Sequence, residues 1–121
     1  MVARKVAARL KPNALMEFTR VMEREILPWL RKQEGFLDLI ILSAPHCREV
    51  ATISFWNDRS HAQAYSATSY PEALKILDKL LDGTPYVKTF DVVASTLHEG
   101  AISRPQEENL VRQRASSEAV N

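Results

Sequence analysis

The segment Phe36–Ser43 reads Phe-Leu-Asp-Leu-Ile-Ile-Leu-Ser and carries large apolar side chains at both odd and even positions. Because successive side chains of a strand point to opposite faces, both faces of this strand must be buried. A second strand is expected over Glu49–Trp56, and the short turn at 44–48 makes the two a predicted β-hairpin. Any fold for this chain must therefore cover both faces of its central strands.

A helix that could cover one face of these strands is expected to begin at Pro12 and Asn13, and Asn13 is expected to cap its free amide groups. Pro28 interrupts the helix and predicts a kink there or a short final segment through Lys32, before Gly35 ends it. Apolar residues at spacings of three and four form a stripe that would lie against a sheet, namely Leu15, Phe18, Met22, Ile26 and Trp29.

The second cover lies after the hairpin. Asp58 is a good helix cap, and a short helix is expected to run through His61 and Tyr65 to a break at residues 68–69. Ser69 and Glu72 then have the spacing of a capping box, which predicts a further helix. Its apolar stripe consists of Leu74, Leu77 and Leu81.

Two outer strands complete the pattern. Residues 2–10 alternate, but Arg4 breaks the apolar set, which indicates either an exposed strand end or an arginine that faces a pocket; we interpret it as the end. Residues 86–97 form the last strand. The order strand, helix, strand, strand, helix, strand predicts an α+β, ferredoxin-like βαββαβ domain over residues 1–98, with a four-stranded antiparallel sheet and helices on one side.

Two helices cover only one face of such a sheet. Burying one leucine or isoleucine side chain contributes roughly 1.5–3 kcal/mol, so leaving several in water would be a heavy loss. We therefore expect a homodimer formed through the open sheet face. The tail, residues 99–121, is expected to be solvated or to pack on the partner subunit.

Composition narrows the function. With 16 Lys and Arg against 15 Asp and Glu, the chain lacks the concentrated positive charge of a nucleic-acid binder. No apolar run approaches the roughly 18 residues of a membrane span. The single Cys47 cannot form a disulfide within the chain, and a cytoplasmic protein is expected. His46 and Cys47 lack further metal ligands, and three glycines provide no phosphate loop, so neither metal nor cofactor is predicted.

Two stretches resemble a known family: Gln33-Glu34-Gly35-Phe36-Leu37 and Ser54-Phe55-Trp56-Asn57-Asp58. They are similar to antibiotic-biosynthesis-monooxygenase-like members of the dimeric α+β barrel superfamily. The resemblance implies a cofactor-independent monooxygenase-like protein that acts on a small aromatic or quinol-type substrate between helices and sheet. It also implies that Trp56 lines this cavity, although ordinary core packing is the alternative interpretation.

The same resemblance weakens two specific activities. Haem-degrading relatives use an asparagine and a histidine where this chain has Val6 and Lys75, so haem binding is not expected. Polyketide-oxidising relatives have an asparagine where this chain has Thr52. That difference favours the alternative function, a non-catalytic dimeric small-ligand-binding or regulatory protein.

His61 and Tyr65 are four residues apart and so share one helix face near Trp56. His61 could abstract a phenolic proton while Tyr65 or Tyr70 orients the substrate ring; the alternative is an exposed helix histidine. The expected pocket residues are Phe18, Met22, Thr52, Trp56, His61, Tyr65 and Tyr70. Two acidic residues within apolar strands, Asp38 and Asp91, are expected to pair, where enclosed, with Arg4, Arg9 or Lys88.

Overall fold

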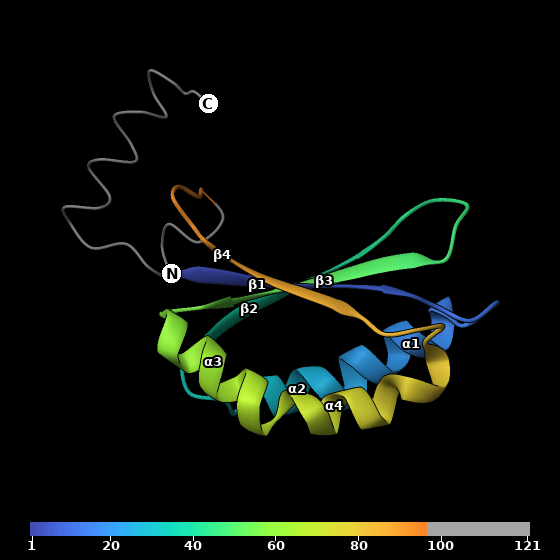
Figure 1. Ribbon diagram of the computed structural model, residues 1–121, viewed down its shortest axis with the longest axis horizontal. Coiled ribbons are helices and arrows are strands. Elements are labelled where there is room, and N and C mark those ends of the chain that lie inside the picture. Colours follow the sequence, from blue (N-terminus) through green and yellow to red (C-terminus); the bar gives the residue numbers. More distant parts are fainter. Residues whose placement is uncertain (97–121) are drawn as a thin grey trace, which may run out of the picture. The chain divides into compact units, whose positions relative to one another are not determined.

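The computed structural model describes residues 1–96. The elements follow the predicted order along the chain (Figure 1). They are β1 (Val2–Arg9), α1 (Leu15–Val21), a π-helical turn (Met22–Ile26), α2 (Leu27–Leu30), β2 (Phe36–Ser43), β3 (Glu49–Trp56), α3 (Arg59–Thr68), α4 (Tyr70–Leu77), a 3-10 turn (Asp78–Leu80) and β4 (Tyr86–Asp91). The chain divides into two compact units, Met1–Phe90 and Asp91–Asn121. The expected strand over residues 86–97 ends earlier, at Asp91, and the tail at 99–121 lies outside the described residues.

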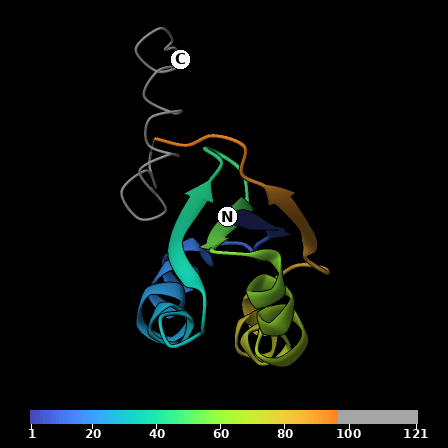
Figure 2. The ribbon, with the colours of Figure 1, turned by 90° about the vertical axis from the view of Figure 1, so that its left-hand side faces the viewer.

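The strands form one four-stranded antiparallel sheet in the order β2-β3-β1-β4. Viewed end-on in Figure 2, the two helical stretches lie side by side beneath this sheet, and both are on the same face. The predicted α+β ferredoxin-like fold is confirmed. The central strand pair β1–β3 brings Val2 opposite Trp56 and Arg9 opposite Glu49.

The first helix shows why Pro28 is tolerated within it. Proline has no backbone N–H and its ring clashes with the preceding turn. Here the turn over Met22–Ile26 widens to the π form, in which the Leu27 N–H donates to the Met22 carbonyl five residues back. A short final segment follows, as predicted, but it ends at Leu30. The expected Asn13 cap is wrong, because Ala14 holds the cap position and Asn13 has a φ of 62° in the turn before it.

The start of α3 is capped as predicted, since the Asp58 carboxylate accepts a hydrogen bond from the His61 amide at 3.0 Å. The predicted capping box at α4 does not form. Ser69 has helical backbone angles and makes no side-chain cap bond, so α3 passes into α4 almost without interruption. Its hydroxyl donates instead to the Gln33 side chain at 3.3 Å.

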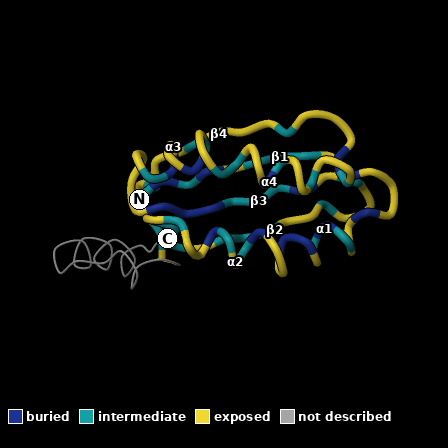
Figure 3. Tube along the Cα trace, turned by 90° about the horizontal axis from the view of Figure 1, so that it is seen from below, coloured by how far each residue is buried: buried dark blue, intermediate teal, exposed yellow. Residues whose placement is uncertain are grey.

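The core lies between the sheet and the helices, and Trp56 and Leu10 are its fully buried large side chains. The tube in Figure 3 shows buried residues gathered on β3 and on the inner sides of the helices, whereas β4 is exposed along most of its length. On the opposite sheet face the register pairs Ile40 with Ile53 and Leu42 with Ala51. Leu42 remains 48% exposed there.

Candidate ligand site between helices and sheet

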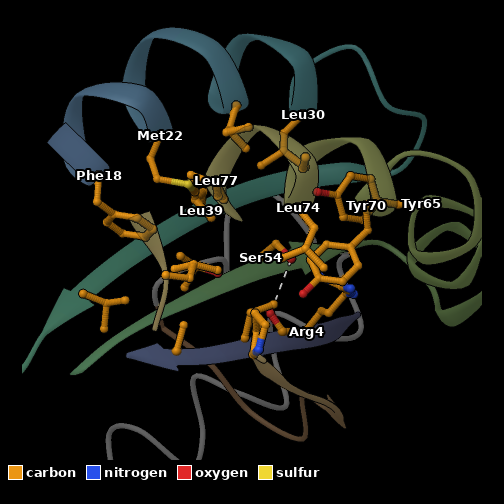
Figure 4. A pocket seen from close by; sticks show the side chains of 18 residues that line it. Arg4, Phe18, Met22, Leu30, Leu39, Ser54, Tyr65, Tyr70, Leu74 and Leu77 are labelled. Carbon is orange, nitrogen blue, oxygen red and sulfur yellow. Dashed lines mark hydrogen bonds between the residues drawn. The ribbon is translucent and has the colours of Figure 1, made fainter. Parts of the chain in front are cut away.

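A small cavity of about 50 Å³ lies between the sheet and the helices. Phe18 and Met22 stand at one end, and Arg4, Tyr65 and Tyr70 gather at the other (Figure 4). Its volume is about a third of the ~150 Å³ apolar cavity that admits benzene. The space under the sheet is therefore mostly filled by side chains.

Arg4 is the charged residue of this cavity, and it is only 3% exposed. On β1 it falls in phase with Val2, Val6 and Ala8, so its side chain faces the helices. Its Nε donates to the Ser66 hydroxyl at 2.7 Å. Our interpretation of Arg4 as an exposed strand end is thus wrong: the strand alternation continues through it, and α3 closes over it.

The guanidinium of Arg4 lies against two aromatic rings. Its Cζ is 4.2 Å from the ring centroid of Tyr70 and 5.2 Å from that of Tyr65, both within cation–π range. Within residues 1–96 no carboxylate lies within 4.0 Å of this guanidinium. Asp38 and Asp91 are both exposed, so the condition for the expected pairing with Arg4, Arg9 or Lys88 is not met. Arg9 lies 3.9 Å from the Asp82 carboxylate.

Burial sets the protonation of this cluster. It raises the pKa of the Tyr65 phenol to about 12 and also raises the pKa of Tyr70, against the opposing effect of the Arg4 charge. Burial lowers the pKa of Arg4, which the neighbouring tyrosines partly offset. A guanidinium nevertheless stays charged at neutral pH. At pH 7 the cluster therefore consists of one cation and two neutral phenols.

Trp56 belongs to the core and not to the cavity lining, in agreement with the alternative interpretation of its role. Its side chain is 0% exposed, and its ring centroid lies 5.5 Å from that of Phe36 and 5.1 Å from that of Tyr65. The indole Nε1 donates to the Ser54 hydroxyl at 2.9 Å, which satisfies its only polar atom. Trp56 thus packs against the ring of Tyr65 from the core side.

His61 also lies outside the cavity lining. Its Nδ1 is 2.7 Å from the Asn57 side-chain oxygen and 3.0 Å from an Asp58 carboxylate oxygen. A Cβ placed on Gly35 would come within 2.4 Å of the His61 ring, so the ring packs directly on the glycine backbone, where φ is 84°. This placement gives no geometric support to His61 as the substrate base and explains why the turn requires glycine.

Five of the predicted pocket residues do line the cavity, namely Phe18, Met22, Thr52, Tyr65 and Tyr70. Sequence reasoning missed Arg4 and Ser54 as lining residues. The signal for Arg4 was its phase in the alternating strand. Of the two positions considered for haem, Val6 lines the cavity, whereas Lys75 does not and lies 3.4 Å from Glu72 with its side chain 75% exposed.

The described residues contain no cluster of three or more His, Cys, Asp or Glu side chains that could hold a metal ion. The same part of the chain has no helix that is long and apolar enough to cross a bilayer. The candidate chemistry of residues 1–96 is thus concentrated in the cavity and in the Arg4–Tyr65–Tyr70 cluster.

No family model and no curated protein matches the chain. Solved structures do match it. SnoaB, a cofactor-independent oxygenase from Streptomyces nogalater, has 20% identity and a TM-score of 0.64 over 78% of this chain and 95% of that chain. The monooxygenase of the gene ActVA-Orf6 of Streptomyces coelicolor, in complex with nanaomycin D, has 15% identity and a TM-score of 0.68 over 78% and 88%.

A third match, the NE2512 protein of Nitrosomonas europaea, is described as being of unknown function. It has 18% identity and a TM-score of 0.66, and the match covers 78% of this chain and 91% of that chain. At such identities the agreement concerns the backbone, and one fold can carry several activities. The chain therefore has the α+β, ferredoxin-like fold of the antibiotic biosynthesis monooxygenase-like structures.

Proposed function

We propose that this chain is a cofactor-independent monooxygenase-like protein that acts on a small, electron-rich aromatic molecule between its helices and sheet. The observation that carries the proposal is the cavity, whose mostly apolar lining includes a polar cluster where Arg4, Tyr65 and Tyr70 converge. Apolar walls with a few converging polar groups are the general form of a small-molecule site. SnoaB, which shares the fold, is a cofactor-independent oxygenase, and this likeness supports the same class of reaction.

The proposed reaction uses the substrate as its own electron donor. Loss of a proton leaves an electron-rich anion that passes one electron to dioxygen, and the two radicals combine to form a carbon–oxygen bond. The resulting hydroperoxide loses water, so that a CH₂ group and one O₂ become a carbonyl group and one H₂O. The protein must bind and orient the ring and favour its anion; no external reductant is required.

The cavity lining contains arginine and tyrosine but no histidine, aspartate or glutamate within the described residues. Substrate deprotonation thus depends on solvent and on stabilisation of the anion. This favours substrates that ionise readily, such as hydroquinones and anthrones. The protonated phenol of Tyr70, which is half-buried at the start of α4, can donate a hydrogen bond that orients the ring.

Oxygen uptake with a panel of hydroquinones and anthrones tests this function. We expect turnover by the wild type and a roughly fivefold loss in kcat/KM for Tyr70→Phe, since one hydrogen bond contributes about 1 kcal/mol. Lys11→Ala changes an exposed residue outside the cavity lining and serves as the control, with rates expected to match the wild type. Absence of uptake above the buffer rate with every substrate would exclude the oxygenase.

A non-catalytic small-ligand-binding or regulatory protein is the second candidate. Two observations favour it: the cavity of about 50 Å³ is small, and Thr52, which lines it, is not an amide. Ligands of this protein would raise the melting temperature without any oxygen uptake. The same substrate panel, followed in parallel by thermal shift and by an oxygen electrode, distinguishes the two candidates.

We further propose that the open sheet face is covered by a second copy of the chain. The described helices cover one face of the sheet, and Ile40, Leu42, Ala51 and Ile53 lie on the opposite face, which nothing within residues 1–96 is seen to cover. Sedimentation equilibrium of the full chain is expected to give a dimer, and Leu42→Lys is expected to weaken it, since an isolated charge is costly to bury. A well-folded monomer at micromolar concentration would contradict this assembly.

A further inference from the structure

We infer that Arg4 is an anion receptor: it selects ligands that present a negatively charged oxygen on a small aromatic ring, and it makes a separate base in the cavity unnecessary. The inference deepens the proposed function, on which it rests for the identity of the cavity as the ligand site. It assigns to Arg4 direct contact with the ligand oxygen.

Arg4 carries a buried positive charge that no carboxylate of residues 1–96 balances. Arg4 is 3% exposed, and its nearest partners are neutral: the Ser66 hydroxyl, 2.7 Å from Nε, and the rings of Tyr65 and Tyr70. Removing a charge from water is costly unless an opposite charge or a full set of hydrogen bonds replaces the water. A ligand anion would supply the counter-charge that residues 1–96 do not provide.

The Arg4 guanidinium has more N–H donors than its described neighbours use. A guanidinium has five N–H donors arranged in a planar fork that matches a carboxylate or another oxyanion. Ser66 accepts from Nε, and Tyr70 is a further neutral neighbour, so donors remain for a ligand. Because they lie in a site of low dielectric, hydrogen bonds from them to an anion would be stronger than the same bonds in water.

The cavity around the Arg4 guanidinium is mostly apolar. Among the described residues, the cavity lining is apolar apart from Arg4, the tyrosines, Thr52 and Ser54, and it contains no acidic side chain that competes for the guanidinium. Ser54 is already engaged, since it accepts from the Trp56 indole and donates to the Arg4 carbonyl at 3.4 Å (Figure 4). The aromatic ring of a ligand would therefore contact apolar walls while its oxygen contacts Arg4.

These features imply a chemical consequence. A site that binds a phenolate better than the corresponding phenol lowers the apparent pKa of the bound ligand by the logarithm of the ratio of the two affinities. Arg4 would thus supply the reactive anion at neutral pH without a histidine in the cavity. The small volume of the cavity means that lining side chains must move when a ring enters, and this cost is common to a charged ligand and its neutral isostere.

The test compares benzoate with its neutral isostere benzamide by isothermal titration calorimetry with the full chain. We expect the wild type to bind benzoate at least about tenfold more tightly, the usual scale for one charge-assisted contact. Arg4→Met should bring the two ligands to similar affinity, and Arg4→Lys should retain part of the preference. Equal affinity of the wild type for both would overturn the inference without any variant.

A spectroscopic arm uses 4-nitrophenol, whose phenolate is coloured. In a pH titration the wild type is expected to lower the apparent pKa of the bound ligand, and Arg4→Met should abolish this shift. Arg9→Met, which removes an exposed arginine from the same strand, should retain it. An identical shift in wild type and Arg4→Met would overturn the inference.

The melting temperature of Arg4→Met distinguishes a ligand-binding role of Arg4 from a structural role. Because Arg4 has no carboxylate partner among the described residues, Arg4→Met should leave the melting temperature unchanged or raise it. A structural arginine would give the opposite, a destabilised Arg4→Met with unchanged anion preference. Oxygen uptake is measured separately: anion binding without uptake overturns only the proposed function, and uptake without anion preference overturns only the inference.

Discussion

Two side chains beneath α3, Trp56 and Arg4, are buried to a similar depth, but their polar groups are satisfied differently. Trp56 is 0% exposed, contacts the rings of Phe36 and Tyr65, and has its indole N–H bonded to Ser54. Arg4 is 3% exposed and carries a charge whose contacts within residues 1–96 are neutral groups. Burial alone therefore does not mark a functional residue; an unmet charge or polar group does.

The comparison also separates two residues that sequence reasoning treated as neighbours. His61 and Tyr65 are on the same helix, α3, yet His61 packs on the Gly35 turn while Tyr65 reaches the cavity. The first turn of α3 thus packs on the connection between α2 and β2, and the next turn contributes to the candidate site. Stability and ligand binding should respond to different substitutions.

The largest expected effect concerns Trp56, whose polar atom is hydrogen-bonded. Trp56→Ala removes a fully buried indole and should lower the free energy of unfolding by about 3–5 kcal/mol, measured by urea denaturation. Arg4→Met, at a position almost as buried, should change it by less than about 1 kcal/mol. Similar losses of unfolding free energy for both variants would contradict the distinction between Trp56 and Arg4.

The second expected effect is a loss of stability at alkaline pH. The folded protein holds the Tyr65 proton up to a pKa of about 12, whereas the unfolded chain releases it near 10. The stabilisation is therefore complete below pH 10 and is lost as the pH rises towards 12, by about 3 kcal/mol. Tyr65→Phe should show a shallower decline in urea midpoint over this range; an equally steep decline would assign it to other groups.

The third effect tests the turn beneath His61. Gly35→Ala should cost about 2 kcal/mol or more, because a left-handed φ penalises any Cβ and because the His61 ring occupies its place. Adding His61→Gly removes the His61 Cβ together with the ring atoms that would lie within 2.6 Å of the new methyl group, so the double variant should be less destabilised than the sum of the two single losses. Strict additivity, measured by thermal or urea unfolding, would show that the ring is not in contact with Gly35.

The smallest effect is that of His61→Ala by itself. Since His61 is outside the cavity lining, we expect oxygen uptake by this variant to equal that of the wild type, with a loss of stability below about 1 kcal/mol. A rate loss of tenfold or more at constant stability would instead restore His61 as the substrate base.

The fold was predictable because its signals are local and repeated. Alternation identified β1 and β3, and a run of apolar residues on both faces identified β2. The stripe of Phe18, Met22 and Ile26 identified the first helix. Cap details were predicted less well: Asp58 caps α3, but Asn13 and Ser69 do not cap with their side chains. A cap depends on the angle at which the chain enters the helix, which tertiary packing sets.

The candidate site was predicted in part, since Phe18, Met22, Thr52, Tyr65 and Tyr70 line the cavity and Trp56 and His61 do not. His61 and Tyr65 were predicted together because they share one helix face close to the family-like motif at 54–58. Neighbours in sequence need not face the same space, however, and one residue of α3 can contact a turn while another contacts the sheet. Helix phase relative to the sheet is a tertiary property.

The sequence by itself determined the order of elements and the need to cover a sheet that is apolar on both faces, because side-chain periodicity records which faces are buried. Only the tertiary structure decided that Arg4 faces inward, against Tyr65 and Tyr70, because strand alternation gives a residue's face but not what lies across from it. The charge of Arg4 becomes informative once its surroundings within residues 1–96 are seen to contain no carboxylate that opposes it.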